Sequence, residues 1–162
     1  MKEILPFCRD LPEVALEAGA VVLEEHGKTG QMFVLLDGAV EVLKGDVPVS
    51  VVDDPGAVFG EMAALLGLPH SATVKTLQDS RFYVVDDGAG FLADHPEVAT
   101  RIARLLARRL HAMTTYLADI KRQFAEQSGQ LGIIDEVLAS LAHDQDETEA
   151  LVSDRDPDTQ VD

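Results

Sequence analysis

A short segment in the middle of the chain reads Phe59-Gly-Glu-Met-Ala-Ala-Leu-Leu-Gly67. Its residues Glu61 to Leu66 are good helix formers, so the segment predicts one or two helical turns bounded by glycine at each end. An α-helix leaves its first N–H groups without partners inside the helix, so such a terminus is a natural anion site. Packing alone is the alternative explanation for a small helix at this place.

The sequence on both sides of this helix has the pattern of β-strands. Between about residues 14 and 86, apolar runs separated by Gly, Asp and Pro recur roughly every 8–12 residues. The predicted strands are Ala20–Glu24, Gln31–Leu36, Ala39–Leu43, Val47–Val52, Ala72–Leu77 and Arg81–Val85. Asp37-Gly38, between two of these runs, predicts a two-residue hairpin. This spacing favours an antiparallel sandwich, jelly roll or small barrel, and it argues against a doubly wound α/β fold.

A long helix is predicted from Pro96 to about Gln127, with Asp94 or His95 as its cap. From Ala103 onward, a seven-residue repeat emerges in alternating steps of four and three, and eleven of its twelve positions are apolar. One set is Ala103, Leu110, Leu117, Phe124, Leu131 and Leu138, and the other is Leu106, Met113, Ile120, Gln127, Ile134 and Leu141. Such a repeat indicates a coiled-coil seam between two chains, with packing on the chain's own core as the alternative. Gly129 and Gly132 predict a break before a short helix near Ile133–Ala142.

These patterns divide the chain into four parts. We expect a β-roll at residues 1–93 with a lead-in at 1–13, a long helix at 94–128, a second helix at 129–142 and a tail at 143–162. The tail holds eight Asp or Glu residues and one Arg, so it is expected to be disordered.

The composition excludes several classes of protein. Of the 162 residues 46% are apolar, enough for a core without disulfides, while aromatic residues make up only 5%, which argues against a base-stacking surface. Thirteen Lys and Arg against 29 Asp and Glu give a net charge of -16, which argues against binding nucleic-acid phosphates. Cys8 is the single cysteine, no signal-peptide pattern follows Met1, and no apolar run approaches the roughly 20 residues that span a bilayer. We therefore expect a cytoplasmic protein without membrane association.

Patterns typical of enzymes and metal sites are missing from the sequence. The five histidines form no H-x-H or H-x-x-x-H pair, no Gly-x-Ser-x-Gly motif is present, and Cys8 has no nucleophile context. His111 is read as a helix surface residue rather than a haem ligand. The basic run Arg101, Arg104, Arg108 and Arg109 is read as a solvated helix face rather than a nucleic-acid contact. We expect no catalytic residue, no metal and no cofactor.

Glu61 directly follows the glycine that starts the short helix. A carboxylate there would repel a bare phosphate, but it can accept hydrogen bonds from hydroxyl groups. A ligand with an anion and a nearby sugar hydroxyl, such as a nucleotide or a sugar phosphate, fits both features.

The longer segment Phe59-Gly-Glu-Met-Ala-Ala-Leu-Leu-Gly-Leu-Pro-His-Ser-Ala-Thr73 resembles the phosphate-binding cassette of cyclic nucleotide-binding domains. The pattern of that cassette is F-G-E-[LM]-A-L, a spacer, and P-R-[ST]-A-[TS]. Residues 24–42 are similar to the family's earlier hairpin signature, and Ala107-Arg-Arg-Leu110 resembles the dimerising helix of catabolite-activator-type regulators. The resemblance covers roughly residues 14–127. It implies an α+β, mainly β fold: an antiparallel jelly-roll β-barrel with an embedded short phosphate-binding helix, followed by a long C-terminal dimerisation helix.

The resemblance also implies how cAMP or cGMP would be bound. The amides from Gly60 to Ala63 would face the cyclic phosphate, Glu61 would accept from the ribose 2′-hydroxyl, and Ser71 would touch phosphate or base. On the long helix Arg109 would pair with Glu61, while Met113 and Thr114 would face the purine. The expected ligand-binding residues are Phe59, Gly60, Glu61, Met62, Ala63, His70, Ser71, Ala72, Arg109, Met113 and Thr114.

One position departs from the family pattern, because the phosphate-binding arginine falls on His70. Arginine offers a permanent charge and two parallel donors, whereas histidine offers at most one donor and is largely neutral at pH 7. Three interpretations stay open: altered binding of a cyclic nucleotide, another ligand in the same pocket, or a pocket kept only as a dimerisation scaffold. The first predicts that His70→Arg tightens cAMP binding and that binding by the natural sequence strengthens from pH 8 to pH 6.

Two functions follow from these observations. The first is a regulatory sensor that passes cyclic-nucleotide occupancy to an unknown protein partner through its C-terminal helices. The alternative is a non-sensing dimeric interaction scaffold with the same fold. A homodimer through the long helix is expected in both cases. Direct DNA binding is not expected, because no helix-turn-helix pattern follows the long helix.

Overall fold

The structure is a computed structural model that describes residues 2–124 and 131–143. The chain forms two compact units, Met1–Ala103 and Arg104–Asp162, and each is described by itself. The acidic tail predicted at 143–162 lies outside the described residues except for His143.

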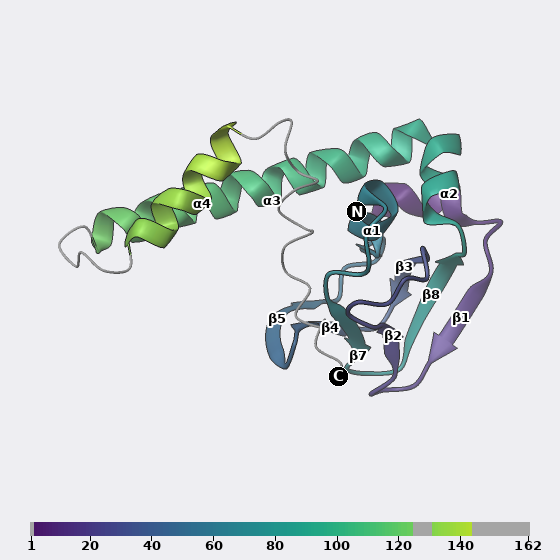
Figure 1. Cartoon of the computed structure of the whole chain (residues 1–162). Coiled ribbons are helices and arrows are strands. Elements are labelled where there is room, and N and C mark those ends of the chain that lie inside the picture. The colour runs from purple at the N-terminus through teal and green to yellow at the C-terminus, as the bar shows by residue number, and fades with distance from the viewer. Residues whose placement is uncertain (1, 125–130, 144–162) are drawn as a thin grey trace, which may run out of the picture. The chain divides into compact units, whose positions relative to one another are not determined.

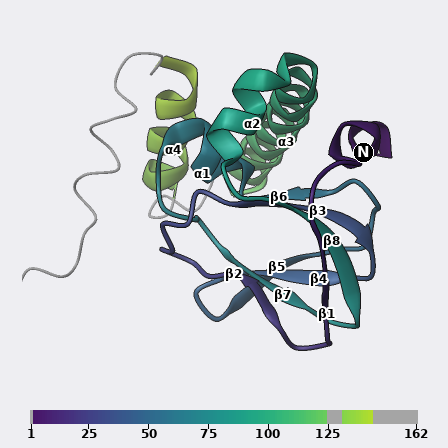
Figure 2. The same ribbon diagram turned by 90° about the vertical axis from the view of Figure 1, so that its right-hand side faces the viewer.

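The first unit is built around eight strands (Figure 1). They are β1 (Glu13–Leu16), β2 (Val21–Leu23), β3 (Met32–Asp37), β4 (Val40–Lys44), β5 (Val47–Val52), β6 (Val58–Phe59), β7 (Thr73–Thr76) and β8 (Ser80–Val85). One sheet has the order β1-β8-β3-β6 and the other β2-β7-β4-β5, with antiparallel pairing throughout. Figure 2 shows β3 and β6 of the first sheet above the strands of the second. The predicted jelly roll is confirmed.

The core of this unit is formed by side chains from both sheets. Its buried members are Leu23, Phe33, Leu35, Val40, Ala57, Phe59, Val74 and Phe82. Phe33 and Phe82 meet edge to face, with ring centroids 6.1 Å apart. Each large apolar side chain buried in this way contributes about 1.5–3 kcal/mol to folding. Phe59, which ends β6, thus anchors the start of the short helix in the core.

One turn connects two strands of the same sheet, and another connects strands of different sheets. Gly45 and Asp46 form the tight turn of the β4–β5 hairpin, in which Lys44 pairs with Val47. The hairpin predicted at Asp37-Gly38 is wrong, because β3 and β4 belong to different sheets. Gly38 instead lies at a corner with φ 114°, where an added Cβ would stand 2.1 Å from the hydroxyl of Ser80. Sequence predicts a turn at this position but not which strands it joins.

The helical parts of the first unit are short. A 3-10 helix, η1 (Lys2–Cys8), precedes the strands and buries Ile4 and Cys8. The short helix α1 (Glu61–Leu66) has the predicted bounds. A further helix, α2 (Gly88–Asp94), was not predicted. Its N-cap is Asp87, whose side chain accepts from the N–H of Gly90. The long helix α3 (Pro96–Gln123) begins at the predicted proline.

The second unit contains the remainder of α3 and helix α4 (Leu131–His143). A contact between Lys121 of α3 and Asp135 of α4 lies within this unit. Residues 125–130, which include Gln127 and Gly129 of the predicted repeat and break, lie outside the described residues. Apolar side chains on both helices are exposed, among them Met113 on α3 and Ile133 on α4. The coiled-coil seam between two chains stays a prediction.

Candidate functional site

The phosphate cassette begins where β6 passes into α1. Gly60 is the N-cap of α1 with φ 85°, and no side chain caps the helix there. An added Cβ at Gly60 would stand 2.4 Å from the carbonyl oxygen of Gln31, so no other residue fits the close approach of these two backbones. No side chain therefore occupies the hydrogen-bonding positions of the first helix amides, which is the arrangement that an anion site requires.

The two faces of α1 differ in burial. Glu61 and Ala63 are buried, whereas Met62, Leu65 and Leu66 are exposed. Glu61 is only 7% exposed. A buried carboxylate is stable only when hydrogen-bonded or paired, and Glu61 has such an interaction in the structure. This position at the start of the helix suits it to accept hydrogen bonds from a ligand hydroxyl.

His70 occupies the position of the family's arginine. It is buried in the β-roll and only 3% exposed. Its backbone bonds to both sides of a turn, with His70 N–H donating to Gly27 and His26 N–H donating to His70. The side-chain Nε2 shares a 2.7 Å hydrogen bond with the hydroxyl of Thr29. The Nδ1 atom is buried without a hydrogen-bond partner among the described residues. Its Cε1 would lie 3.4 Å from a Cβ added at Gly60.

Burial lowers the pKa of His70 from its ordinary value of 6.5, because the charged imidazolium loses its hydration. Burial therefore favours the neutral form of His70. The expected rise in affinity between pH 8 and pH 6 then requires that the bound anion raise this pKa again, and it stays a prediction.

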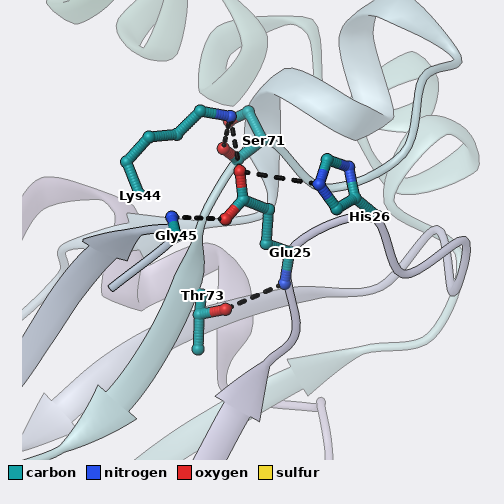
Figure 3. Close-up of polar contacts among 6 residues, drawn as sticks. All are labelled: Glu25, His26, Lys44, Gly45, Ser71 and Thr73. Carbon is teal, nitrogen blue, oxygen red and sulfur yellow. Dashed lines mark hydrogen bonds and ion pairs between the residues drawn. The ribbon is translucent and has the colours of Figure 1, made fainter. Parts of the chain in front are cut away.

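The segment after His70 is tied to two other loops by the cluster in Figure 3, which joins Glu25, His26, Lys44, Gly45, Ser71 and Thr73. Lys44 Nζ lies 2.6 Å from Glu25 Oε1 and donates a 2.7 Å hydrogen bond to the carbonyl oxygen of Ser71. Gly45 N–H donates to Glu25 Oε2 at 2.7 Å. Glu25 N–H donates to the hydroxyl of Thr73 at 3.0 Å. The cluster therefore connects the cassette to the β4–β5 turn.

The electrostatics of this cluster are those of a paired carboxylate. The hydrogen bond from Lys44, followed by that from Gly45 N–H, lowers the pKa of Glu25 from its ordinary 4.5. Sequence analysis missed Glu25 and Lys44, since neither belongs to the cassette pattern. The only local signal is Gly45-Asp46, which predicts the turn beside Lys44 but not its contact with Ser71.

A hollow of about 360 Å³ lies elsewhere on the first unit. It is lined by Lys28, Gly30, Ala63, Ala64, Gly67, Leu68, Pro69, Asp87 and Ala89. Of the expected ligand-binding residues only Ala63 belongs to this lining. The hollow therefore shares Ala63 with the predicted phosphate cradle and is otherwise lined by different residues.

The expected ligand-binding residues are divided between the two units. Phe59, Gly60, Glu61, Met62, Ala63, His70, Ser71 and Ala72 all belong to the first unit, whereas Arg109, Met113 and Thr114 belong to α3 within the second. Thr114 donates its hydroxyl to the carbonyl oxygen of Leu110. The predicted pairing of Arg109 with Glu61 and the predicted purine contacts stay predictions.

Neither metal ligation nor membrane insertion is indicated by the described part of the chain. No group of three or more His, Cys, Asp or Glu side chains in it could hold a metal ion. Among its helices none has the length and apolar character needed to cross a bilayer.

Comparison with known proteins agrees with this geometry. Residues 13–91 match the family model described as the cyclic nucleotide-binding domain. A CRP-like cAMP-activated global transcriptional regulator of Mycobacterium tuberculosis is 25% identical over 123 residues, which cover 72% of this chain and 55% of the regulator. The Pycsar effector protein XpPycTIR of Xanthomonas perforans is 30% identical over 135 residues, which cover 78% of this chain and 44% of the effector. The chain spans about half the length of the curated relatives it matches.

Solved structures show the same fold. The Thermus thermophilus catabolite activator protein has a TM-score of 0.63 at 18% identity, over 87% of this chain and 81% of that chain. A structure from work on a cyclic-GMP-dependent signalling pathway that regulates bacterial phytopathogenesis has a TM-score of 0.58 at 26% identity. That match covers 68% of this chain and 94% of the other.

Proposed function

Because residues 13–91 belong to the cyclic nucleotide-binding domain family, we propose that the protein binds cAMP or cGMP at the Gly60 cradle and acts as a regulatory sensor. The observation that carries the proposal is the start of α1, where an uncapped helix terminus lies beside the buried carboxylate of Glu61. The amides match the charge of a phosphodiester, and the carboxylate matches a sugar hydroxyl. Names of relatives that include a cAMP-activated regulator and a cyclic-GMP-dependent pathway support the same ligand class.

The sensor works by binding rather than by catalysis. A ligand shifts a conformational equilibrium only when it binds one state more tightly than another. Arg109, Met113 and Thr114 lie on α3 in the second unit, so contacts between them and a bound nucleotide would favour one arrangement of the two units. The long helix would then report occupancy to a protein partner.

Titration calorimetry with cAMP and cGMP tests the proposal, and thermal unfolding gives an independent readout because a ligand of the folded state raises the melting temperature. We expect saturable binding of at least one of the two nucleotides, with linear 5′-AMP and 5′-GMP binding more weakly. A flat response to every cyclic nucleotide would refute the proposal.

The role of Glu61 can be isolated by changing the ligand as well as the protein. Losing a hydrogen bond to a charged group lowers affinity by about ten- to a hundredfold, or about 1.5–3 kcal/mol. We expect Glu61→Gln to weaken binding of the ribose-bearing nucleotide by this amount. The same variant should bind the 2′-deoxy analogue as well as the natural protein does. An equal loss for both ligands would mean that Glu61 acts on the structure of the pocket instead.

The scaffold function is a second candidate, favoured by the exposed apolar side chains of the second unit. Met113 is 59% exposed on α3 and Ile133 is 69% exposed on α4. We expect light scattering to give the mass of a dimer for the natural chain. Met113→Glu should shift it toward the monomer, while Thr115→Glu, an exposed control on the same helix, should not. A dimer that binds no nucleotide would favour the scaffold over the sensor.

A further inference from the structure

The family pattern has an arginine that matches the charge of the proposed ligand, but this chain has His70 at that position. A cyclic nucleotide carries one negative charge on its phosphodiester, and the cassette contributes a carboxylate, Glu61, of the same sign. His70 occupies the arginine position, but it is buried against Thr29 and Gly60. Desolvation lowers its pKa, which disfavours the charged imidazolium. Arg109, the predicted partner of Glu61, belongs to the second unit, so a cation that neutralises the phosphate from within the first unit must be another residue.

Lys44, at the end of β4, brings an ammonium group to the cassette. Its Nζ donates to the carbonyl oxygen of Ser71, the residue that directly follows His70 (Figure 3). Two other lysines of the first unit lack such a bond. Lys28 lines the hollow together with Ala63, Gly67 and Pro69 of the cassette, and Lys75 is exposed on β7 opposite Glu41. Neither has a hydrogen bond to the cassette among those that the structure gives for the described residues.

The contacts of Lys44 allow it to leave its present partner. Its side chain is 60% exposed, so most of the four-carbon stem faces solvent. Glu25, with a side chain only 12% exposed, keeps a second hydrogen bond from Gly45 N–H when the lysine moves. Removing one of two donors leaves the carboxylate hydrogen-bonded, which avoids the penalty of an unsatisfied buried charge.

We propose that Lys44 is the phosphate-binding cation of this site: it moves from Glu25 to an exocyclic oxygen of the cyclic phosphate and takes the role that arginine has in the family pattern. The inference rests on the proposed function. An ammonium is a compact point charge on a flexible stem, so it can reach either exocyclic oxygen but cannot form the two parallel hydrogen bonds of a guanidinium. Glu25 and the phosphate then compete for the ammonium group of Lys44.

Two substitutions with opposite expected effects test the proposal by calorimetry with cAMP and cGMP. Lys44→Met removes the cation and should weaken binding about ten- to a hundredfold. Glu25→Gln keeps an acceptor for Gly45 N–H but no longer attracts the ammonium, so binding should tighten severalfold. If the Glu25–Lys44 pair only held the loops in place, both substitutions would weaken binding.

Matched controls separate this effect from changes in net charge and in folding. Lys75→Met makes the same charge change on the exposed face of β7 and should leave affinity within about twofold. Lys44→Arg keeps a cation and should retain most of the affinity. Melting temperatures of all variants without ligand identify any that fail to fold, and Glu25→Gln then gives the decisive result, since it predicts a gain.

The outcomes are distinguishable from failure of the proposed function. If the natural chain binds neither nucleotide, the proposed function and this inference are both overturned. If the natural chain binds and Lys44→Met binds equally well, only the role of Lys44 is overturned. Weaker binding by Lys44→Met together with tighter binding by Glu25→Gln supports the inference.

Discussion

Gly60→Ala is predicted to damage both the stability of the first unit and the cradle, whereas Gly67→Ala at the other end of α1 provides a matched control. Both glycines have positive φ, 85° at Gly60 and 67° at Gly67. An L-residue in this conformation costs about 1–2 kcal/mol. The difference lies in the space available, because a Cβ at Gly67 meets nothing within 4 Å.

At Gly60 the same Cβ would lie 2.4 Å from the backbone oxygen of Gln31, with Leu23 and His70 next to it at 3.2 and 3.4 Å. The backbones must separate by about 0.6 Å to reach the 3.0 Å below which real Cβ contacts are essentially absent. Overpacking of this kind costs about 1–3 kcal/mol beyond the strain in φ. We therefore expect losses of about 1–2 kcal/mol for Gly67→Ala and about 2–5 kcal/mol for Gly60→Ala.

Urea unfolding measures this difference, with tyrosine fluorescence as a probe. The chain has two tyrosines and no tryptophan, and Tyr83 is buried in β8 while Tyr116 is 65% exposed. With an m-value near 2 kcal/mol/M, the two variants should differ by about 0.5–1.5 M in their midpoints. Equal midpoints would refute the close approach of Gly60 to Gln31. Calorimetry should also show weakened nucleotide binding for Gly60→Ala alone.

Two further predictions follow from buried titratable groups. Burial raises the pKa of Cys8 from 9.0 to about 11, so its thiol should react with iodoacetamide far more slowly in the folded than in the urea-unfolded protein at pH 8. Since the unfolded chain loses this proton first, stability should fall as pH rises from about 9 toward 11, and Cys8→Ala should remove that part of the decline. For His70, a lowered pKa and a phosphate held by Lys44 predict nearly constant nucleotide affinity between pH 8 and pH 6, so a severalfold rise toward pH 6 would return the phosphate contact to His70. His70→Arg should tighten cAMP binding about tenfold in the same calorimetric assay.

Local patterns predicted the elements that are determined locally. The strand β5 and the helix α1 both have the predicted bounds. Turn residues mark the ends of β5, and a glycine marks each end of α1. The second helix was expected near Ile133–Ala142 and runs from Leu131 to His143. Helix α2 was missed because its start, Gly88-Ala-Gly90, has poor helix propensity and depends on the Asp87 cap.

Tertiary context decided the elements that sequence misassigned. Asp37-Gly38 has the chemistry of a hairpin, yet the chain changes sheets there, and Ser80 occupies the space beside Gly38. The very short β6, of two residues, has no period that a pattern could reveal. In both cases the deciding contact comes from a residue more than 20 positions away, which a local pattern does not contain.

The features of the candidate site also differ in whether local sequence or tertiary contacts determine them. The predicted cradle of backbone amides depends on the positive φ of Gly60 and on the close approach of the Gln31 backbone to it. Both features require glycine at this one position, so the cassette pattern predicts them. The charge of a side chain depends instead on its hydration and its partners. The pKa of His70 is lowered because segments at Thr29 and Gly60 enclose its imidazole, and Lys44 reaches Ser71 from a strand 27 residues away. A substitution of arginine by histidine therefore does not by itself leave the phosphate without a positive charge, because another cation that the fold brings to the same oxygen atoms can supply it.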